Sequence, residues 1–275
     1  MKTVMNNQKF NQYMNPLIDI AKAAGTAIMQ VYSTDFGVEK KEDNSPLTQA
    51  DLAAHHVIVN ALRALTPSIP VLSEESENID YEIRKEWQQY WLIDPLDGTR
   101  EFVKRNGEFT VNIALIDGQQ SILGVVYAPV TELLYFASLA HGAFKQEANK
   151  PAVQIHTKRL DVNKPIVAGS RSHSDEKMQR FMQHIEDKFG VKAELISMGS
   201  SLKICLIAEG VADVYPRLGP TSEWDTAAAH CVLTEAGGDI VDETGLSLRY
   251  NSKRSLLNPY FFAKSAGDIN WSSYL

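Results

Sequence analysis

The chain has 275 residues, of which 44% are hydrophobic and 22% are charged, and its formal net charge at pH 7 is −7. This length allows one large or two modest domains, and the composition is that of an ordinary globular protein with a sizeable core. Lysine and arginine occur in no run longer than a pair such as Lys40 and Lys41. Sequence-independent nucleic-acid binding needs a basic patch, so the charge pattern excludes it as the main role.

Two cysteines, Cys205 and Cys231, are too few for a disulfide scaffold and too far apart for a zinc cluster. The N-terminal residues lack the apolar core of a signal peptide, and no window reaches about 18 consecutive apolar residues. We therefore expect a cytoplasmic protein without a transmembrane segment.

Helices are predicted first along the chain. Apolar residues recur at helical spacing and predict one face of a long amphipathic helix: Leu17, Ile20, Ala24, Ile28 and Val31. The polar stretch 37–51 predicts a loop. A second helix follows, with its inner face formed by Ile58, Val59, Leu62 and Leu65.

Strands are predicted next. The stretch 68–76, SIPVLSEES, predicts a short strand that ends in carboxylates, and 89–95, QYWLIDP, predicts another that Pro95 ends. Four β-type segments between Thr110 and Gln146 then predict an antiparallel meander. The polar stretch 146–164 is predicted to be irregular and to form a domain boundary.

The second half alternates between strand and helix patterns. Strands are predicted over 165–170, 193–198 and 212–216, and helices over 178–189, 201–210 and 225–236. We therefore expect an N-terminal α+β domain over 1–150 and a C-terminal α/β domain over 151–275.

The stretch 91–102, WLIDPLDGTREF, places Asp94 and Asp97 directly after an apolar run. Taken alone it is a typical β-turn sequence. The spacing does not fit an EF-hand, because the third and fifth ligand positions are Leu96 and Gly98. A haloacid-dehalogenase phosphatase has one residue between its aspartates, whereas this chain has two, which argues against a phospho-aspartyl enzyme and leaves it as a weaker alternative.

Other carboxylates favour a functional site. Glu74 and Asp94 each end a predicted strand, and Asp225 begins a predicted helix, where a capping role is an equally ordinary interpretation. Carboxylates and a main-chain carbonyl are the hard oxygen ligands that Mg²⁺ prefers. The Gly98 and Thr99 amides would form an anion-binding nest. Metal ions beside a phosphate nest indicate phosphoryl chemistry.

Three stretches together resemble the inositol-monophosphatase superfamily of Mg²⁺-dependent, lithium-sensitive phosphatases. They are LSEES (72–76), WLIDPLDGTREF (91–102) and EWDTAAAHCVLTEAGG (223–238), in the order and spacing of that family. The resemblance implies a layered αβαβα sandwich, as in the inositol monophosphatases and fructose-1,6-bisphosphatases, with the active site between the two halves.

The resemblance also implies roles for individual residues. It implies oxygen ligands for two or three Mg²⁺ ions: Glu74, Asp94, Asp97, Asp225 and the main-chain carbonyl of Leu96. Thr99 and Glu74 would orient the attacking water, and Asp51 would hydrogen-bond Thr99. On its own sequence context Asp51 is as readily a helix carboxylate. The loop 37–46 would be a mobile flap over the metal site.

The stretches 169–173, GSRSH, and 215–225, YPRLGPTSEWD, resemble the 3′(2′),5′-bisphosphate nucleotidases, especially the bacterial ones of sulfate assimilation. Arg217 stands where inositol monophosphatases have a glutamate, and a guanidinium suits a second phosphate. The resemblance implies these substrate contacts: Gly98, Thr99, Ser170, His173, Gly199, Lys203 and Arg217. The alternatives are a turn for Ser170, a solvated helix lysine for Lys203 and a helix cap for His173.

The function expected from this resemblance is Mg²⁺-dependent hydrolysis of 3′-phosphoadenosine 5′-phosphate to AMP and phosphate in sulfur metabolism, with the 5′-phosphosulfate as a further candidate substrate. One alternative is an inositol monophosphatase or broad sugar phosphatase, and another is a non-catalytic member that binds a nucleotide or a partner. Family members are monomers or homodimers. Some relatives associate with the inner face of the membrane, but we find no basic amphipathic helix for this.

Overall fold

The computed structural model describes residues 7–34, 46–76, 79–170, 176–267 and 269–274. His173 lies outside this part of the chain. The expected flap over 37–46 also lies outside it, except for Pro46, which begins a helix. Within the described residues, no helix is both long and apolar enough to cross a membrane.

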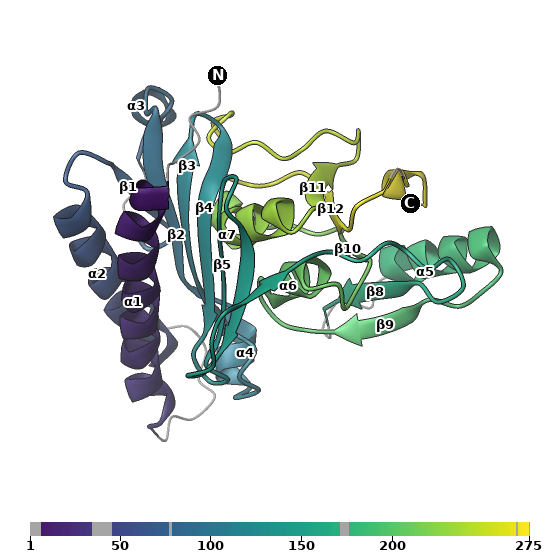
Figure 1. Cartoon of the computed structure of the whole chain (residues 1–275), viewed down its shortest axis with the longest axis horizontal. Helices are drawn as coiled ribbons and strands as arrows, with labels where there is room; N and C mark the ends of the chain where they lie inside the picture. The colour runs from purple at the N-terminus through teal and green to yellow at the C-terminus, as the bar shows by residue number, and fades with distance from the viewer. Residues whose placement is uncertain (1–6, 35–45, 77–78, 171–175, 268, 275) are drawn as a thin grey trace.

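Two long helices, α1 (Asn7–Tyr32) and α2 (Pro46–Leu65), pack together on one face of a sheet (Figure 1). The apolar positions that predicted them, among them Leu17 and Leu62, are fully buried. The loop expected over 37–51 is wrong from Pro46 onward, because α2 begins there. Proline suits the first helical position, where its fixed φ is already helical and its missing N–H is not needed.

The first sheet has seven strands in the order β1-β2-β3-β4-β5-β6-β7. Its strands are β1 (Val71–Ser73), β2 (Gln89–Asp97), β3 (Thr110–Asp117), β4 (Gln120–Ala128), β5 (Leu133–Ser138), β6 (Gly142–Glu147) and β7 (Val153–Ile155). β1 pairs with β2 in parallel and every other neighbour is antiparallel, so the predicted meander is confirmed. β7 lies in the stretch expected to be irregular. Only Ile155 in it is buried, which leaves no alternation to detect.

β2 continues through Pro95 to Asp97, so the expectation that Pro95 ends the strand is wrong. The pairing of β2 with β3 is regular up to Asp94 and shifts between Asp94 and Asp97. Such an irregularity accommodates a proline, which has no N–H to donate to the neighbouring strand. Both aspartates therefore stand at the same end of one strand.

The second sheet has five strands in the order β11-β12-β10-β8-β9. They are β8 (Ile166–Gly169), β9 (Glu194–Ser197), β10 (Val214–Arg217), β11 (Asp239–Asp242) and β12 (Phe261–Lys264). Between the two sheets lie α6 (Leu202–Ala208) and α7 (Glu223–Glu235), and on the far side of the second sheet lies α5 (Glu176–Phe189) with the short helix η1 (Trp271–Tyr274) (Figure 1). The order of layers is αβαβα, as expected. Two short helices, α3 (Tyr81–Arg84) and α4 (Thr99–Val103), flank β2.

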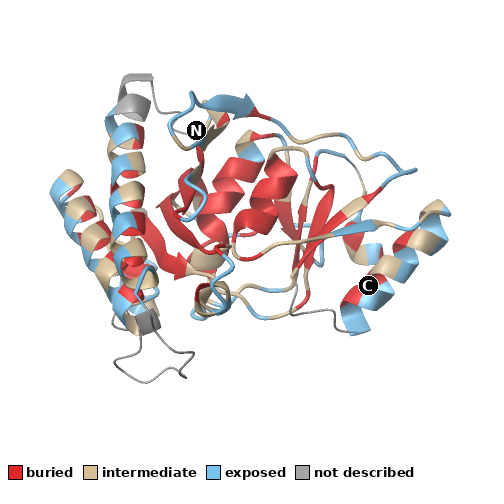
Figure 2. Cartoon of the chain, turned by 90° about the horizontal axis from the view of Figure 1, so that it is seen from below, coloured by how far each residue is buried: buried red, intermediate tan, exposed pale blue. Residues whose placement is uncertain are grey.

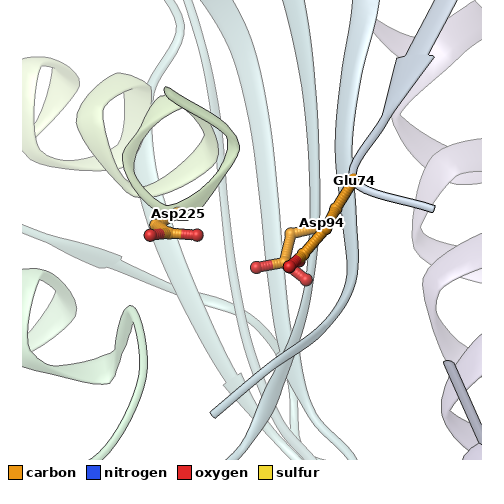
Figure 3. Close-up of side chains that lie close together, drawn as sticks. All are labelled: Glu74, Asp94 and Asp225. Atoms are coloured by element: carbon orange, nitrogen blue, oxygen red, sulfur yellow. The ribbon is translucent and has the colours of Figure 1, made fainter. Parts of the chain in front are cut away.

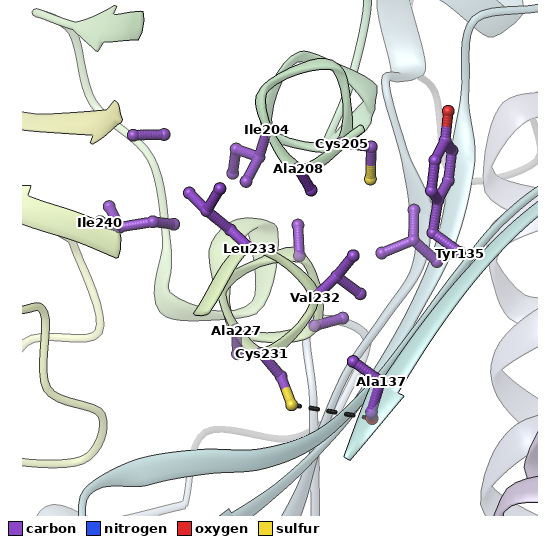
Figure 4. Close-up of a cluster of buried hydrophobic side chains, with 14 of the residues drawn as sticks. Tyr135, Ala137, Ile204, Cys205, Ala208, Ala227, Cys231, Val232, Leu233 and Ile240 are labelled. Atoms are coloured by element: carbon purple, nitrogen blue, oxygen red, sulfur yellow. Dashed lines mark hydrogen bonds between the residues drawn. The ribbon is translucent and has the colours of Figure 1, made fainter. Parts of the chain in front are cut away.

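α7 is the centre of the molecule, and it is buried around most of its circumference (Figure 2). β4 approaches it so closely that a Cβ atom at Gly124 would lie 2.1 Å from the carbonyl oxygen of Ala228. Figure 4 shows the apolar cluster that α6 and α7 form against the sheet, including Cys205 and Cys231. Both thiols are buried and unbonded to another sulfur, and the Cys231 thiol lies 3.7 Å from the carbonyl oxygen of Ala137.

Candidate metal and phosphate site

Three carboxylates from three elements converge between the first sheet and α7 (Figure 3). Glu74 follows β1 directly, and its N–H donates to the carbonyl oxygen of Ile93, the residue before Asp94, at 3.2 Å. Parallel pairing of β1 and β2 thus brings Glu74 beside Asp94. Asp225 faces them from the first turn of α7, and one carboxylate oxygen from each of the three lies within 4.8 Å of the others.

Asp225 has the capping role that its sequence position offered. It is the third residue of α7, and one of its oxygens, Oδ2, accepts the N–H of Ser222 at 2.8 Å in a capping box. This bond orients the side chain at the start of the helix. The same side chain belongs to the three-carboxylate group, so the two interpretations of this position are compatible.

Burial and mutual repulsion make two of these carboxylates, Asp94 and Asp225, costly to ionise. Asp94 is 1% exposed, and burial first, then the charges of Glu74, Asp97 and Asp225, raise its pKa well above the usual range. Burial and then the charge of Asp97 raise the pKa of Asp225 to about 7. A cation bound among them would relieve this repulsion. The donors are all carboxylate oxygens, which fits a hard divalent ion such as Mg²⁺.

The other expected ligands lie around this group. Asp97 is not one of the three clustered carboxylates, and its Oδ2 accepts hydrogen bonds from Ser201. Its charge is nevertheless the largest electrostatic influence on the pKa of Asp225. Leu96 is buried, and its N–H donates to Asp94 Oδ1 at 3.0 Å. Asp51 is buried in α2, and its charge contributes to the raised pKa of Asp94.

A cavity of about 300 Å³ adjoins the carboxylates through Asp97 and Asp225, which line it. Five of the expected substrate residues also line it: Gly98, Thr99, Ser170, Lys203 and Arg217. Gly98 precedes α4 with φ +96°, a left-handed conformation that favours glycine, and an added Cβ would crowd the Glu108 carbonyl oxygen at 3.2 Å. The cavity therefore joins carboxylates and cationic side chains in one space.

Two of the cations that line this cavity, Lys203 and Arg217, have different surroundings. Lys203 is 6% exposed, which rules out a solvated helix lysine, and its Nζ donates to the carbonyl oxygens of Ser200 at 2.7 Å and Met198 at 3.3 Å. Burial, with a smaller contribution from Arg217, lowers its pKa to about 8. Arg217 donates through Nη2 to the carbonyl oxygen of Pro220 at 2.8 Å. Its buried Nε has no hydrogen-bond partner within the described residues.

The remaining expected contacts differ in their positions. Gly199 is not among the residues that line the cavity, and its N–H donates to Glu108 Oε2 at 2.8 Å. Ser170 lines the main cavity and a small adjoining one, which Met178 and Leu218 also line. Ser201 was not predicted at all, although it touches Asp97. A serine at the start of a predicted helix is an ordinary capping residue, so its type and position gave no signal of this contact.

Comparisons with known proteins show the family to which this chain is similar. The model of the inositol monophosphatase family matches residues 10–269. The 3′(2′),5′-bisphosphate nucleotidase CysQ of Escherichia coli K12 is 50% identical over 252 residues, which cover 90% of this chain and 98% of that protein. The 3′(2′),5′-bisphosphate nucleotidase CysQ of Buchnera aphidicola is 41% identical over 263 residues, which cover 94% of this chain and 96% of that protein.

Solved structures of the same family share the fold of this chain. The crystal structure of CysQ from Bacteroides thetaiotaomicron, a bacterial member of the inositol monophosphatase family, is 41% identical and covers 93% of this chain and 99% of its own, with a TM-score of 0.83. An inositol monophosphatase from Zymomonas mobilis, 19% identical over 98% of this chain and 99% of its own, shares the fold with a TM-score of 0.77. Because the family match spans nearly the whole length and close relatives align over nine-tenths of it, this chain belongs to the inositol monophosphatase family.

Proposed function

We propose that the chain is a Mg²⁺-dependent 3′(2′),5′-bisphosphate nucleotidase that converts 3′-phosphoadenosine 5′-phosphate to AMP and phosphate. One observation carries the proposal: a single cavity has the carboxylates Asp97 and Asp225 in its lining together with the cations Lys203 and Arg217. A substrate with two phosphates needs both kinds of environment. One phosphate would meet metal ions at the carboxylates, and the other would meet cationic side chains.

The oxygen ligands proposed for two or three Mg²⁺ ions are Glu74, Asp94, Asp97, Asp225 and the main-chain carbonyl of Leu96. Magnesium bound there supplies neutralisation of phosphate charge and a lowered pKa for a nearby water. Thr99 and Glu74 would orient that water for in-line attack on the 3′-phosphorus. Asp51 would support Thr99. The bond between phosphorus and the ribose 3′-oxygen breaks, and the ribose oxygen leaves with a proton.

The second phosphate is assigned to Arg217 and Lys203, with Gly98 and Thr99 amides at the reacting phosphate. Arg217 uses Nη2 for Pro220, and its unpartnered Nε supports a role toward a ligand oxygen. Lys203 uses two of its three donors on carbonyl groups. Ser170, Gly199 and His173 remain proposed nucleotide contacts, of which His173 lies outside the described residues.

The test is phosphate release with Mg²⁺ from 3′-phosphoadenosine 5′-phosphate, from its 5′-phosphosulfate and from inositol 1-phosphate at matched concentrations. We expect a strong preference for the nucleotides. Arg217→Glu should lower kcat/KM for the bisphosphate by about tenfold or more, since a lost charge-assisted bond is worth about 1.5–3 kcal/mol. Arg180→Glu, an exposed site on α5, is the matched control. A preference for inositol 1-phosphate would contradict the nucleotide assignment.

We further propose that the protein acts in the cytoplasm, as a monomer or homodimer, in sulfur metabolism. Two buried free thiols support a reducing compartment. Fractionation of cells that produce the tagged chain tests the location. Recovery in the membrane pellet would instead indicate a peripheral membrane association.

A further inference from the structure

A serine hydroxyl links two of the proposed metal ligands. Ser201 Oγ lies 2.7 Å from Asp97 Oδ2 and 2.8 Å from the main-chain carbonyl oxygen of Asp225. The Ser201 N–H donates to the same Asp97 oxygen at 2.6 Å. Asp97 ends β2 of the first sheet and Asp225 lies in the first turn of α7, so one buried residue connects the Asp97 carboxylate to the backbone of Asp225.

Ser201 does not act as a helix cap. It stands in the N-cap position of α6, where a serine hydroxyl usually accepts an N–H from the first helical turn, and it makes no such bond. A hydroxyl has one proton, so it donates to one of its two acceptors at a time, and the carboxylate is the stronger acceptor. The position therefore serves Asp97 in place of the helix.

Asn112 orients this hydroxyl. Its Nδ2 donates to Ser201 Oγ at 2.8 Å, and its Oδ1 accepts the Thr110 hydroxyl at 3.0 Å. Asn112 and Thr110 are both buried in β3, where Asn112 pairs with Asp94 of β2 and Thr110 pairs with Asp97. Because the amide donates to the Ser201 oxygen, the hydroxyl proton is directed to its own two acceptors, Asp97 Oδ2 and the Asp225 carbonyl oxygen. The same Nδ2 also lies 3.4 Å from Asp97 Oδ2, so Asn112 and Ser201 hold one carboxylate oxygen together.

The turn before Ser201 holds it in place. Ser200 has φ +47°, a conformation that non-glycine residues adopt only where their surroundings fix it. Lys203 Nζ donates to the Ser200 carbonyl oxygen, and Glu108 accepts the N–H of Gly199. The turn is thus fixed by side chains from α6 and from the segment before β3.

We propose that Ser201 is a positioning residue for the metal site. It holds Asp97 by Oδ2, which leaves Oδ1 to face an ion, and it sets the distance between the ends of β2 and α7. It acts through the ligands and not on the reacting atoms. This inference rests on the proposed function, because it assumes that Asp97 and Asp225 bind the metal.

The direct test measures metal binding without substrate. Mn²⁺ serves as the probe, and electron paramagnetic resonance counts the free ion. Ser201→Ala removes the hydroxyl and keeps the backbone N–H bond to Asp97. We expect its Kd for Mn²⁺ to rise about tenfold or more, the usual effect of losing a hydrogen bond to a ligand. Ser138→Ala is the control, since Ser138 is buried and its hydroxyl has no partner in the described chain.

A double-mutant cycle tests whether Asn112 acts through Ser201. Asn112→Ala should also raise the Kd for Mn²⁺, and the double variant should lose less than the sum of the two single losses, because the Asn112 amide reaches Asp97 through Ser201 at 2.8 Å and directly only at 3.4 Å. Additive losses would contradict the chain. In kinetics, Ser201→Ala should need more Mg²⁺ for half-maximal rate, recover kcat at excess Mg²⁺, and keep the parental KM for the nucleotide.

Two outcomes would overturn the inference separately from the proposed function. Parental Mn²⁺ affinity in Ser201→Ala would reject the positioning role, and a raised KM at every Mg²⁺ concentration would make Ser201 a substrate contact. Failure of the parent chain to bind Mn²⁺ would reject both the inference and the proposed metal site. Hydrolysis of a different phosphate ester would change the proposed substrate and leave the Mn²⁺ result intact.

Discussion

Arg84 offers a sharp test of how the two halves are held together. It ends α3, between β1 and β2, and is 2% exposed. Its guanidinium donates to Asn251 Oδ1 and to the carbonyl oxygens of Lys253 and Arg254, and Asn251 Nδ2 returns a bond to the Arg84 carbonyl oxygen at 2.6 Å. The Asn251 N–H donates to Glu223 Oε2 at 2.7 Å. Arg84 therefore connects the first sheet to the start of α7.

The expected cost of Arg84→Ala follows from the acceptors that lose their donor. A buried polar group left unpaired costs about 1–3 kcal/mol, and removing one member of a buried charged network costs about 3–5 kcal/mol. Asn251 is buried, so the cost of leaving its Oδ1 unpaired lies at the high end of this range. The carbonyl oxygens of Lys253 and Arg254 are only partly buried and can bind water instead. We expect a loss of about 3–4 kcal/mol in the free energy of unfolding.

Urea unfolding at pH 7 in EDTA measures this loss without a contribution from bound metal. Arg254→Ala is the matched control, because Arg254 pairs with Asp80 and Glu82 at the surface and should change stability by less than about 1 kcal/mol. Arg84→Lys should recover only part of the loss, since an ammonium lacks the guanidinium fork. If Arg84→Ala proved no more destabilising than the control, the reasoning from buried acceptors would be refuted.

Three further predictions concern single residues. Burial lowers the pKa of His55, whose Nδ1 lies 2.9 Å from Ser73 Oγ, so the free energy of unfolding should fall as the pH drops from about 6.5 through the lowered folded-state pKa. Urea midpoints measured against pH should show this fall, and the same pH profile in His55→Gln would contradict the assignment. Burial lowers the pKa of Lys203 to about 8, so kcat/KM for the nucleotide should fall above that pH, and Lys203→Arg should move this fall to higher pH. If kcat/KM fell at the same pH in both proteins, Lys203 would not be the group whose titration causes the fall. Magnesium at 100 times its Kd should stabilise the parent chain by about 2.7 kcal/mol, measured as a rise in Tm that EDTA reverses. Asp94→Asn should abolish this rise, and a variant that kept it would show that Asp94 is not a metal ligand.

Periodicity and strand ends predicted much of the fold from the sequence. The helical face of α1, the meander from β3 to β6 and the alternation of strands and helices after residue 165 follow from which residues are buried, and burial is what hydrophobic patterns encode. Glu74 and Asp94 were predictable neighbours, because one directly follows a recognisable strand and the other lies near the end of the next. The resemblance supplied the remaining candidates.

Other features could not be predicted from patterns. Ser201 and Asp97 meet only after both sheets are in place, and no spacing in the sequence encodes that contact. β7 has a single buried residue, and α2 begins at a proline that resembles a turn signal. Arg84 likewise looks like a surface residue in a charged segment until Asn251 is seen beside it. Contacts of this kind depend on three-dimensional placement and not on which face of an element is apolar.

The three aspartates of the site share a feature that explains why caps and ligands were hard to separate. One oxygen of each accepts a hydrogen bond from the chain: Oδ1 of Asp94 from the Leu96 N–H, Oδ2 of Asp97 from Ser201, and Oδ2 of Asp225 from the Ser222 N–H. A carboxylate has two oxygens, so the bond fixes the side chain while the other oxygen stays available to an ion. Local structure thus orients these side chains in advance, and a cation bound by them would cost less in lost side-chain freedom. The turn and cap residues that make the motif look ordinary are therefore part of what would make it bind metal.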